Sequence, residues 1–288
     1  MTVEIIAEGL AFPEGPVVMA DGSLIVVELG GGRVTRCWKG RKETISEIGG
    51  GPNGAAIGPD GALYVCNSGG LDMAAGGNAT GPGCEGRLER IDLATGRVER
   101  VFDAAEGIPL SAPNDLIFAP DGSLWFTDMG KRYGRTTEAS ALLHCDPSLA
   151  TITRVSDKAV SYNGVGLSPD GKTVYVADTF QARVYSFDAA ASGRQKPGFV
   201  GTVPGMVWLD SLAVTAAGNV CVGTIFDGGI STVTPAGSVT QTPFDETFVT
   251  NIAFGGADMR DAYVTLSTTG LLVRARWSEP GLKLTFNA

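Results

Sequence analysis

The sequence contains few of the residues that most often carry metal or nucleophilic chemistry. Its 288 residues include one histidine, His144, and five scattered cysteines that form no C-x-x-C pair. This odd number of cysteines indicates free thiols in a reducing compartment rather than disulfides or a zinc site. No apolar run approaches the roughly 18 residues of a membrane helix, and the N-terminal segment lacks the basic start of a targeting signal. We therefore expect a cytoplasmic protein with no membrane partner, and we expect His144 to be structural.

Positive charge is also scarce. The 22 Lys and Arg residues face 31 Asp and Glu residues, which leaves a net charge of −9. A chain of this sign repels a phosphate backbone, so we expect no nucleic-acid partner. A hydrophobic content of 43% with 18% charged residues excludes disorder. No segment keeps a 3.6-residue apolar period over three turns, whereas 41 glycines indicate many tight turns between short strands. These features predict an all-β protein.

A repeat organises the chain. Six copies consist of a short apolar run, a turn of the Asp-Gly type and a β-rich run, as in PNDLIFAPDGSLWFTD. The turn positions are Asp21, Asp60, Asp121, Asp170, Ala217 and Asp258. Further strand-like runs lie between the copies, giving four strands per unit, which is typical of a propeller blade. We predict a single domain over residues 1–288, a six-bladed β-propeller with four antiparallel strands per blade. The last blade takes its outer strand either from residues 3–8 or from residues 282–286.

An oxygen-bearing side chain stands seven residues before each turn position. These residues are Glu14, Asn53, Asn114, Asn163, Asp210 and Asn251. The innermost strands of a propeller surround its central channel, so equivalent positions should form a ring around the axis. Seven residues at about 3.3 Å each place this ring at the face opposite the Asp-Gly turns.

Simpler explanations cover this set only in part. Asn-Gly is a common turn dipeptide, which accounts for Asn53 and Asn163, but the other four residues are not followed by this signal. A water-filled channel does not explain why Glu14 and Asp210 converge with no Lys or Arg in the same register. A divalent cation would balance them. Oxygen ligands of this kind suit Ca²⁺ best, with Mg²⁺ or Mn²⁺ next and Zn²⁺ also possible.

A second layer of polar residues is expected at the same face, where the return strands end. It comprises Glu28, Asn67, Asp128, Asp178, Thr224 and Ser267. These side chains either orient the ring residues or cap the strand ends, and capping is the expected role for any single one. The turn aspartates should have no catalytic role.

Four motifs resemble those of a known family. FPEGP, APNDLIFAPDGSLWFTD, YNGVGLSPDGKTVYVADT and LDSLAV occur in the order found in the senescence marker protein/gluconolactonase/luciferin-regenerating enzyme family. The resemblance extends over essentially the whole chain, and diisopropyl fluorophosphatase is a more distant relative. It implies a six-bladed propeller, a divalent metal in the channel, usually calcium, and hydrolysis of lactones or related esters.

The resemblance also implies roles for single residues. Glu14, Asn163 and Asp210 would bind the metal. Asn114 would be a fourth ligand or would hold a water molecule and the substrate. Asp210, or else Glu14, would take the proton of the attacking water, and a direct attack by Asp210 is a variant of this mechanism. Asn53 and Asn251 are not implied by the resemblance. They are predicted to contact the substrate only because they stand seven residues before a turn position.

The sequence departs from the family pattern around this site. Ala112 stands where sugar-lactone hydrolases often have an arginine that contacts substrate hydroxyls, and Tyr162 stands where proline is common. Apolar side chains lie beside ring positions, namely Met129, Phe180, Met206 and Trp208. We therefore predict a lactone less polar than a sugar lactone, with Tyr162 and Trp208 among its contacts.

Two segments beside the ring have no assigned role. Residues 68–86 form a glycine-rich insertion that is a candidate lid. Lys131, Arg132 and Arg135 either meet an anionic group of the substrate or belong to a solvated loop. The alternatives to a lactonase are a hydrolase of organophosphate or fluorophosphate esters with the same metal site, and a non-catalytic binding propeller. The lactone itself and the oligomeric state are not determined by the sequence.

Overall fold

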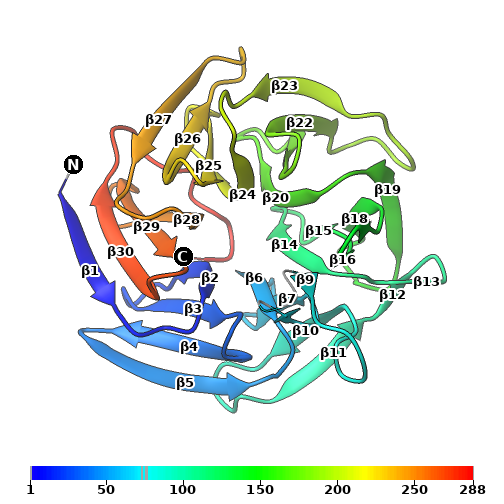
Figure 1. Cartoon of the computed structure of the whole chain (residues 1–288), viewed down its shortest axis with the longest axis horizontal. Coiled ribbons are helices and arrows are strands. Elements are labelled where there is room, and N and C mark those ends of the chain that lie inside the picture. The colour runs from blue at the N-terminus through cyan, green and yellow to red at the C-terminus, as the bar shows by residue number, and fades with distance from the viewer. Residues whose placement is uncertain (1, 73, 75–76, 288) are drawn as a thin grey trace.

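Six four-stranded antiparallel sheets surround a central axis in the computed structural model, which describes residues 2–72, 74 and 77–287 (Figure 1). The predicted all-β, six-bladed propeller is confirmed. From the inside outward, blade 1 consists of β2 (Pro13–Val18), β3 (Leu24–Glu28), β4 (Arg33–Trp38) and β5 (Arg41–Glu47). Blade 2 consists of β6 (Pro52–Ile57), β7 (Leu63–Asn67), β10 (Arg87–Ile91) and β11 (Val98–Phe102). Blade 3 consists of β14 (Pro113–Phe118), β15 (Leu124–Asp128), β18 (Ser140–Cys145) and β19 (Ile152–Ala159).

Blades 4 to 6 repeat the same order. Blade 4 consists of β20 (Tyr162–Leu167), β21 (Thr173–Asp178), β22 (Arg183–Asp188) and β23 (Gly198–Thr202). Blade 5 consists of β24 (Trp208–Val214), β25 (Val220–Ile225), β26 (Gly229–Val233) and β27 (Val239–Pro243). Blade 6 consists of β28 (Val249–Gly255), β29 (Asp261–Leu266), β30 (Leu271–Arg276) and β1 (Val3–Ala7). Each innermost strand contacts the innermost strands of both neighbouring blades, so these six strands enclose the channel.

The ring of blades is closed by the N-terminal strand. β1 pairs antiparallel with β30, with Val3 opposite Ala275 and Ile5 opposite Val273. Of the two segments that the sequence left open, residues 3–8 therefore supply the closing strand. The outer strand of the last blade thus comes from the N-terminal end of the chain, whereas its other three strands come from the C-terminal end. This pairing closes the ring of blades.

The C-terminal segment, residues 280–287, instead lies across the channel at the face of the Asp-Gly turns, and the C-terminus lies near the axis in Figure 1. The backbone N–H of Leu282 donates to the carbonyl of Val214, 2.9 Å away. Leu284 packs against the core between blades 3 and 4, and Phe286 packs edge-on against Phe118 with ring centroids 6.2 Å apart. Apolar side chains at alternate positions thus hold this tail on several blades.

The Asp-Gly turns are stabilised by their own side chains. Asp121 Oδ1 accepts hydrogen bonds from the backbone N–H and the hydroxyl of Ser123, at 2.9 and 2.7 Å. Asp21 binds Ser23 in the same way, at 3.0 and 2.6 Å. Gly122 has a φ of 88°, which a residue with a side chain adopts only at a cost. These aspartates therefore satisfy local backbone groups, as expected of turn residues.

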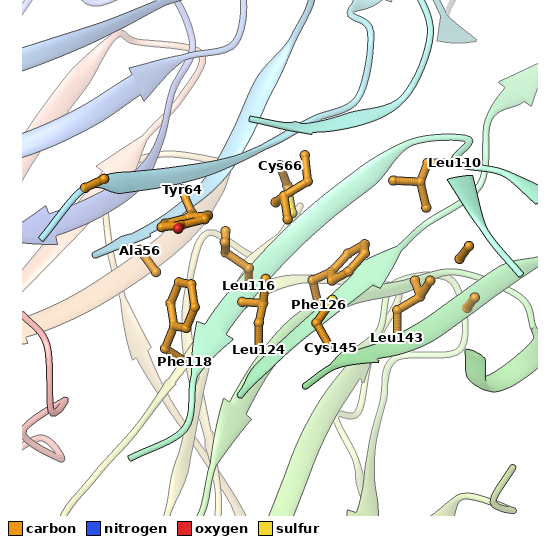
Figure 2. Packing of buried hydrophobic residues seen from close by; sticks show 14 residues of the cluster. Ala56, Tyr64, Cys66, Leu110, Leu116, Phe118, Leu124, Phe126, Leu143 and Cys145 are labelled. Atoms are coloured by element: carbon orange, nitrogen blue, oxygen red, sulfur yellow. The ribbon is translucent and has the colours of Figure 1, made fainter. Parts of the chain in front are cut away.

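Apolar side chains between neighbouring blades form the core. Figure 2 shows one such interface, in which Tyr64 and Cys66 of blade 2 face Leu116, Phe118 and Phe126 of blade 3. Burying this apolar surface is the main favourable contribution to folding. Four of the five cysteines are buried and all five are free, as predicted.

Short two-stranded sheets decorate the propeller. They pair β8 (Leu71–Asp72) with β9 (Gly77–Asn78), β12 (Ala104–Ala105) with β13 (Ile108–Pro109), and β16 (Arg132–Tyr133) with β17 (Thr136–Thr137). Over the described ranges, no helix is long and apolar enough to cross a membrane. The cytoplasmic location and the single domain over residues 1–288 stay predictions.

Candidate metal and active site

The six ring residues lie near the starts of the innermost strands, at the end opposite the Asp-Gly turns. We call this end the ring face and the other end the turn face. All six side chains are buried, with exposed fractions between 2% for Glu14 and 9% for Asp210. They come from β2, β6, β14, β20, β24 and β28 in turn, so every blade contributes one. The structure therefore places the predicted residues at one level of the channel wall.

A break in strand pairing accompanies each ring residue. In blade 3, Pro113 pairs with Asp128 and Leu116 pairs with Phe126, so Asn114 and Asp115 together lie opposite one residue of β15. Equivalent shifts occur in the other five blades. Such a bulge bends the strand and changes the direction of its side chains. The ring thus depends on a local irregularity that the alternation of a regular strand does not predict.

Close approach of neighbouring inner strands explains two glycines that follow ring residues. A Cβ on Gly15 would lie 2.5 Å from the carbonyl oxygen of Asn53, and Gly15 has a φ of 48°. A Cβ on Gly164 would lie 2.7 Å from the carbonyl oxygen of Asp210. Larger residues would push the blades apart at the level of the ring. The Asn-Gly pair at Asn163 therefore belongs to this packing rather than to a hairpin turn.

Hydrogen bonds hold the ring amides in defined orientations. Asn251 Nδ2 donates to Glu14 Oε2 over 3.2 Å. The amide nitrogens of Asn114 and Asn163 lie 3.7 and 3.9 Å from Met129 Sδ, and Asn163 Nδ2 also donates to a threonine hydroxyl. The Oδ1 atoms of Asn114, Asn163 and Asn53 are buried and have no hydrogen-bond partner in the described part of the chain.

Two buried carboxylates face these amides. Burial raises the pKa of Glu14 well above its usual range, and the charge of Asp210 raises it further. Burial also raises the pKa of Asp210 to about 7, while hydrogen bonds from Asn163 and the Ser211 backbone oppose that rise. Neither carboxylate forms an ion pair with any residue that the structure describes. The channel therefore brings together two carboxyl groups whose charged forms no cationic side chain of the described residues balances.

The donor set fits a hard divalent cation. Buried carbonyl oxygens without partners cost free energy, and so do neighbouring carboxylates in a confined space. An ion with oxygen ligands would satisfy both, and Ca²⁺ accepts this mixture of amides and carboxylates. Among the described residues, no group of three or more His, Cys, Asp and Glu side chains is arranged to hold a metal. The amides of Asn114 and Asn163 would have to complete the coordination of the two carboxylates.

The second polar layer binds backbone rather than the ring side chains. Asp128 accepts hydrogen bonds from the backbone N–H groups of Ser111 and Ala112, at 2.9 and 2.7 Å. Asn67 Oδ1 similarly accepts from the N–H of Gly51 over 2.9 Å. Each acceptor ends a return strand and fastens the loop that leads into its own inner strand. These residues cap strand ends and thereby fix the point at which each ring residue begins.

Two predicted substrate contacts have different surroundings. Trp208 is half-buried at the start of β24, two residues before Asp210. Tyr162 is 2% exposed and packs between Tyr185 and Phe187 in the core of blades 3 and 4. Because its ring is enclosed by that core, Tyr162 is not part of the site that we propose below.

The candidate lid and the basic loop contact one another on the ring face. The backbone N–H of Arg132 donates to Asn78 Oδ1 over 2.8 Å, and Lys131 Nζ donates to the carbonyl of Cys84. The insertion from blade 2 thus rests against blade 3. Residues 73 and 75–76 of this insertion lie outside the described residues.

A cavity of about 680 Å³ occupies the channel on the turn side of the ring. Its walls are mainly aliphatic, and the tail residues Leu282 and Leu284 lie across its far end. Asn251 and Asp115 line it close to the ring level. Burial raises the pKa of Asp115 to about 7, and the charge of Asp210 adds to that rise.

Asp115 is a neighbour of the ring that the sequence did not single out. It follows a ring residue, at a place where the other copies have Gly, Ser or Ile. A carboxylate at this position was the available signal. Met129 was predicted only as an apolar side chain beside a ring position, and its contact with the amides of Asn114 and Asn163 depends on how blades 3 and 4 meet.

Comparison with known proteins agrees with the fold and the motifs. The family described as "SMP-30/Gluconolactonase/LRE-like region" matches residues 12–268. Lactonohydrolase oryL of Aspergillus oryzae is 33% identical over 128 residues, which cover 42% of this chain and 28% of that protein. The gluconolactonase of Zymomonas mobilis is 25% identical over 215 residues, covering 65% of this chain and 55% of that protein. The matches thus span less than two thirds of either relative.

A solved structure supports the same architecture. Regucalcin of Agrobacterium tumefaciens, described as a calcium-binding protein, superposes with a TM-score of 0.75. The match covers 98% of both chains at 19% sequence identity. At this identity the similarity shows a shared propeller fold.

Proposed function

This chain belongs to the SMP-30/gluconolactonase/LRE-like family, and on that premise we propose that it hydrolyses a lactone with the help of a divalent metal ion. The observation that carries the proposal is the ring itself. Three buried amide oxygens and two buried carboxylates meet at one level of the channel, and the described residues supply no hydrogen-bond donor to the former and no ion pair to the latter. A scaffold that only binds a partner at its rim has no use for such an arrangement.

Glu14, Asn163 and Asp210 would hold the ion, and Asn114 would complete the set or hold a water molecule beside it. Calcium is the proposed ion because all these ligands are oxygens, and a related propeller is described as calcium-binding. When bound, the ion would polarise the lactone carbonyl and make a neighbouring water molecule more acidic.

The protein's own groups would position the reactants. The buried Oδ1 atom of Asn114 can accept a hydrogen bond from the attacking water, because its amide nitrogen is turned toward Met129. Asp210 would take the proton of that water, with Glu14 as the second carboxylate able to do so. Asn251 holds Glu14 in place through its amide nitrogen. Direct attack by Asp210 on the substrate is the variant of this scheme.

The proposed substrate is less polar than a sugar lactone. Ala112 is buried beneath the strand-end cap of Asp128, where an arginine in related enzymes would reach substrate hydroxyls. A methyl group at this position offers no hydrogen bond to a polyol. Trp208, close to Asp210 in sequence, offers apolar surface instead.

Metal analysis combined with turnover tests the proposal. Protein purified without chelator should contain about one divalent ion per chain by mass spectrometry. It should open γ- and δ-lactones, lose this activity in EDTA, and regain it with Ca²⁺. A panel containing gluconolactone, γ-butyrolactone and a phosphotriester separates the chemistries.

Two results would overturn the proposal. One is a folded, metal-free protein that binds no added divalent ion and opens no lactone. The other is a metal-dependent protein that hydrolyses the phosphotriester and none of the lactones, which would assign the site to phosphoester chemistry.

A further inference from the structure

Five aromatic side chains form a continuous arc on the ring face. We call Phe180, Trp208, Phe226, Phe248 and Phe12 the aromatic arc. Successive rings meet edge-to-face, with centroid separations of 5.1, 5.0, 5.9 and 6.4 Å in that order. The arc runs over blades 4, 5, 6 and 1, so it involves four of the six blades on this face.

The arc is tied to the candidate site by short chain segments. Trp208 and Phe12 each stand two residues before a carboxylate of the ring, and Phe248 stands three residues before Asn251. Phe180 and Phe226 each follow the end of a return strand by one or two residues. The aromatic arc and the ring residues are therefore carried by the same ends of the inner and return strands.

The arc is only partly covered by protein, and part of it is held in an unfavourable backbone conformation. Phe226 is 45% exposed and all five rings are at least partly accessible. Phe226 has a φ of 80° and Phe12 a φ of 56°, a region that bulky side chains rarely adopt. Glycine or asparagine would fit both positions with less strain. Strained residues of this kind concentrate at ligand-binding sites.

A cation completes the arc. The guanidinium carbon of Arg132 lies 5.8 Å from the ring centroid of Phe180 and 5.7 Å from that of Trp208, within the range of a cation–π contact. Arg132 forms no ion pair with the carboxylates in the described part of the chain. Its backbone is held by Asn78 of the candidate lid. The planar guanidinium therefore extends the aromatic surface toward blade 3.

We propose that the aromatic arc and Arg132 bind a flat aromatic ring carried by the lactone, so that the substrate class is an aryl-substituted lactone. This inference rests on the proposed function and specifies its substrate. Edge-to-face and stacked contacts favour an aromatic ring over an aliphatic group of equal bulk. The guanidinium plane of Arg132 offers a further face for stacking. A sugar lactone carries no aromatic ring to place against this surface.

A matched set of lactones tests the inference. We would compare γ-phenyl-, γ-cyclohexyl- and unsubstituted γ-butyrolactone with the Ca²⁺-loaded protein. The kcat/KM for the phenyl compound should exceed that for the cyclohexyl compound about tenfold. Binding of the lactam analogue of the phenyl compound, measured by calorimetry, provides a readout that does not need turnover.

Variants locate the effect. Trp208→Leu should lower the phenyl-to-cyclohexyl ratio of kcat/KM about tenfold, and Phe226→Leu and Arg132→Gln about threefold each. In these variants, turnover of unsubstituted γ-butyrolactone should fall less than turnover of the phenyl compound, because the unsubstituted lactone has no ring to place against the arc. Trp38→Leu is the matched control, because Trp38 is 45% exposed at the end of an outer strand of blade 1.

The outcomes separate this inference from the proposed function. Equal kcat/KM values for the phenyl and cyclohexyl lactones, unchanged by Trp208→Leu, would overturn the aromatic subsite and leave the lactonase proposal standing. Absence of all lactone turnover would overturn the proposed function. Phenyl-lactam binding that weakens in Phe226→Leu but not in Trp38→Leu would support the subsite independently.

Discussion

The two ends of the six inner strands differ in what their polar side chains do. At the turn face, Asp21 and Asp121 bind the hydroxyl and backbone of a nearby serine, so each turn satisfies its own polar groups. At the ring face, the side-chain oxygens of Asn53 and Asn114 are buried and have no hydrogen-bond partner among the residues that the structure describes. The same repeat therefore produces a set of self-sufficient turns at one end and an unsatisfied polar ring at the other.

This difference distinguishes residues kept for the fold from residues kept for a ligand. A polar group that satisfies its neighbours stabilises the protein by itself. A buried polar group without a partner destabilises it, and natural sequences retain such groups mainly where something binds. The turn aspartates Asp21 and Asp121 accordingly bind their neighbours in the same way, whereas the ring mixes carboxylates with amides.

Substituting one aspartate at each face should give the largest contrast. Asp210→Asn should lower lactone turnover at least about a thousandfold, because it removes both a proposed ligand and the proposed proton acceptor. Its melting temperature without metal should stay the same or rise, since a buried charge is lost. Asp121→Asn should keep turnover within about twofold. Steady-state kinetics and thermal unfolding of both variants make the comparison, and similar activity losses at both faces would contradict it.

The two faces should also respond to pH with opposite sign. Burial raises the pKa of Asp210 to about 7, so the folded metal-free protein binds more protons than the unfolded chain between about pH 4 and 7. Its stability should therefore fall as the pH rises through this window, by on the order of 4 kcal/mol for a pKa moved from about 4 to about 7. The serine hydroxyls lower the pKa of Asp21 and of Asp121, so their contribution is complete above about pH 4 and is lost on further acidification.

Urea unfolding in EDTA at several pH values measures both effects. The free energy of unfolding should be highest near pH 4–5, and Asp210→Asn should flatten the decline toward pH 7. Saturating Ca²⁺ should remove that decline in the wild type, because the ion balances the carboxylates. A metal-free protein that becomes steadily more stable from pH 4 to 7 would be inconsistent with a buried, uncompensated ring.

The tail at the turn face should matter for stability alone. Phe286→Ala removes a half-buried ring that packs on Phe118, which should cost about 2 kcal/mol, or half the usual cost for a fully buried phenylalanine. Metal content and kcat for γ-butyrolactone should be unchanged. Chemical unfolding and metal analysis of the same sample check both statements. A loss of bound metal would mean that the tail acts on the ring through the channel.

The sequence by itself determined the repeat, the number of blades and the level of the ring. A period in turn residues and apolar runs reflects local rules, because Asp-Gly turns and strand alternation depend on near neighbours in the chain. The offset of seven residues from each turn placed Glu14 and Asp210 at one level of the wall for the same reason. The closing strand was left open, since residues 3–8 and 282–286 are both short apolar alternations.

Only the tertiary structure decided how these pieces meet. The pairing of β1 with β30 joins opposite ends of the chain, and no local signal specifies a contact at that distance. Tyr162, expected at the substrate, is instead enclosed between blades 3 and 4. Contacts between blades also place Met129 against the amides of Asn114 and Asn163 and Arg132 against Trp208. The aromatic arc is continuous for the same reason. Local preferences build each blade, but the packing of blades around the axis creates the site.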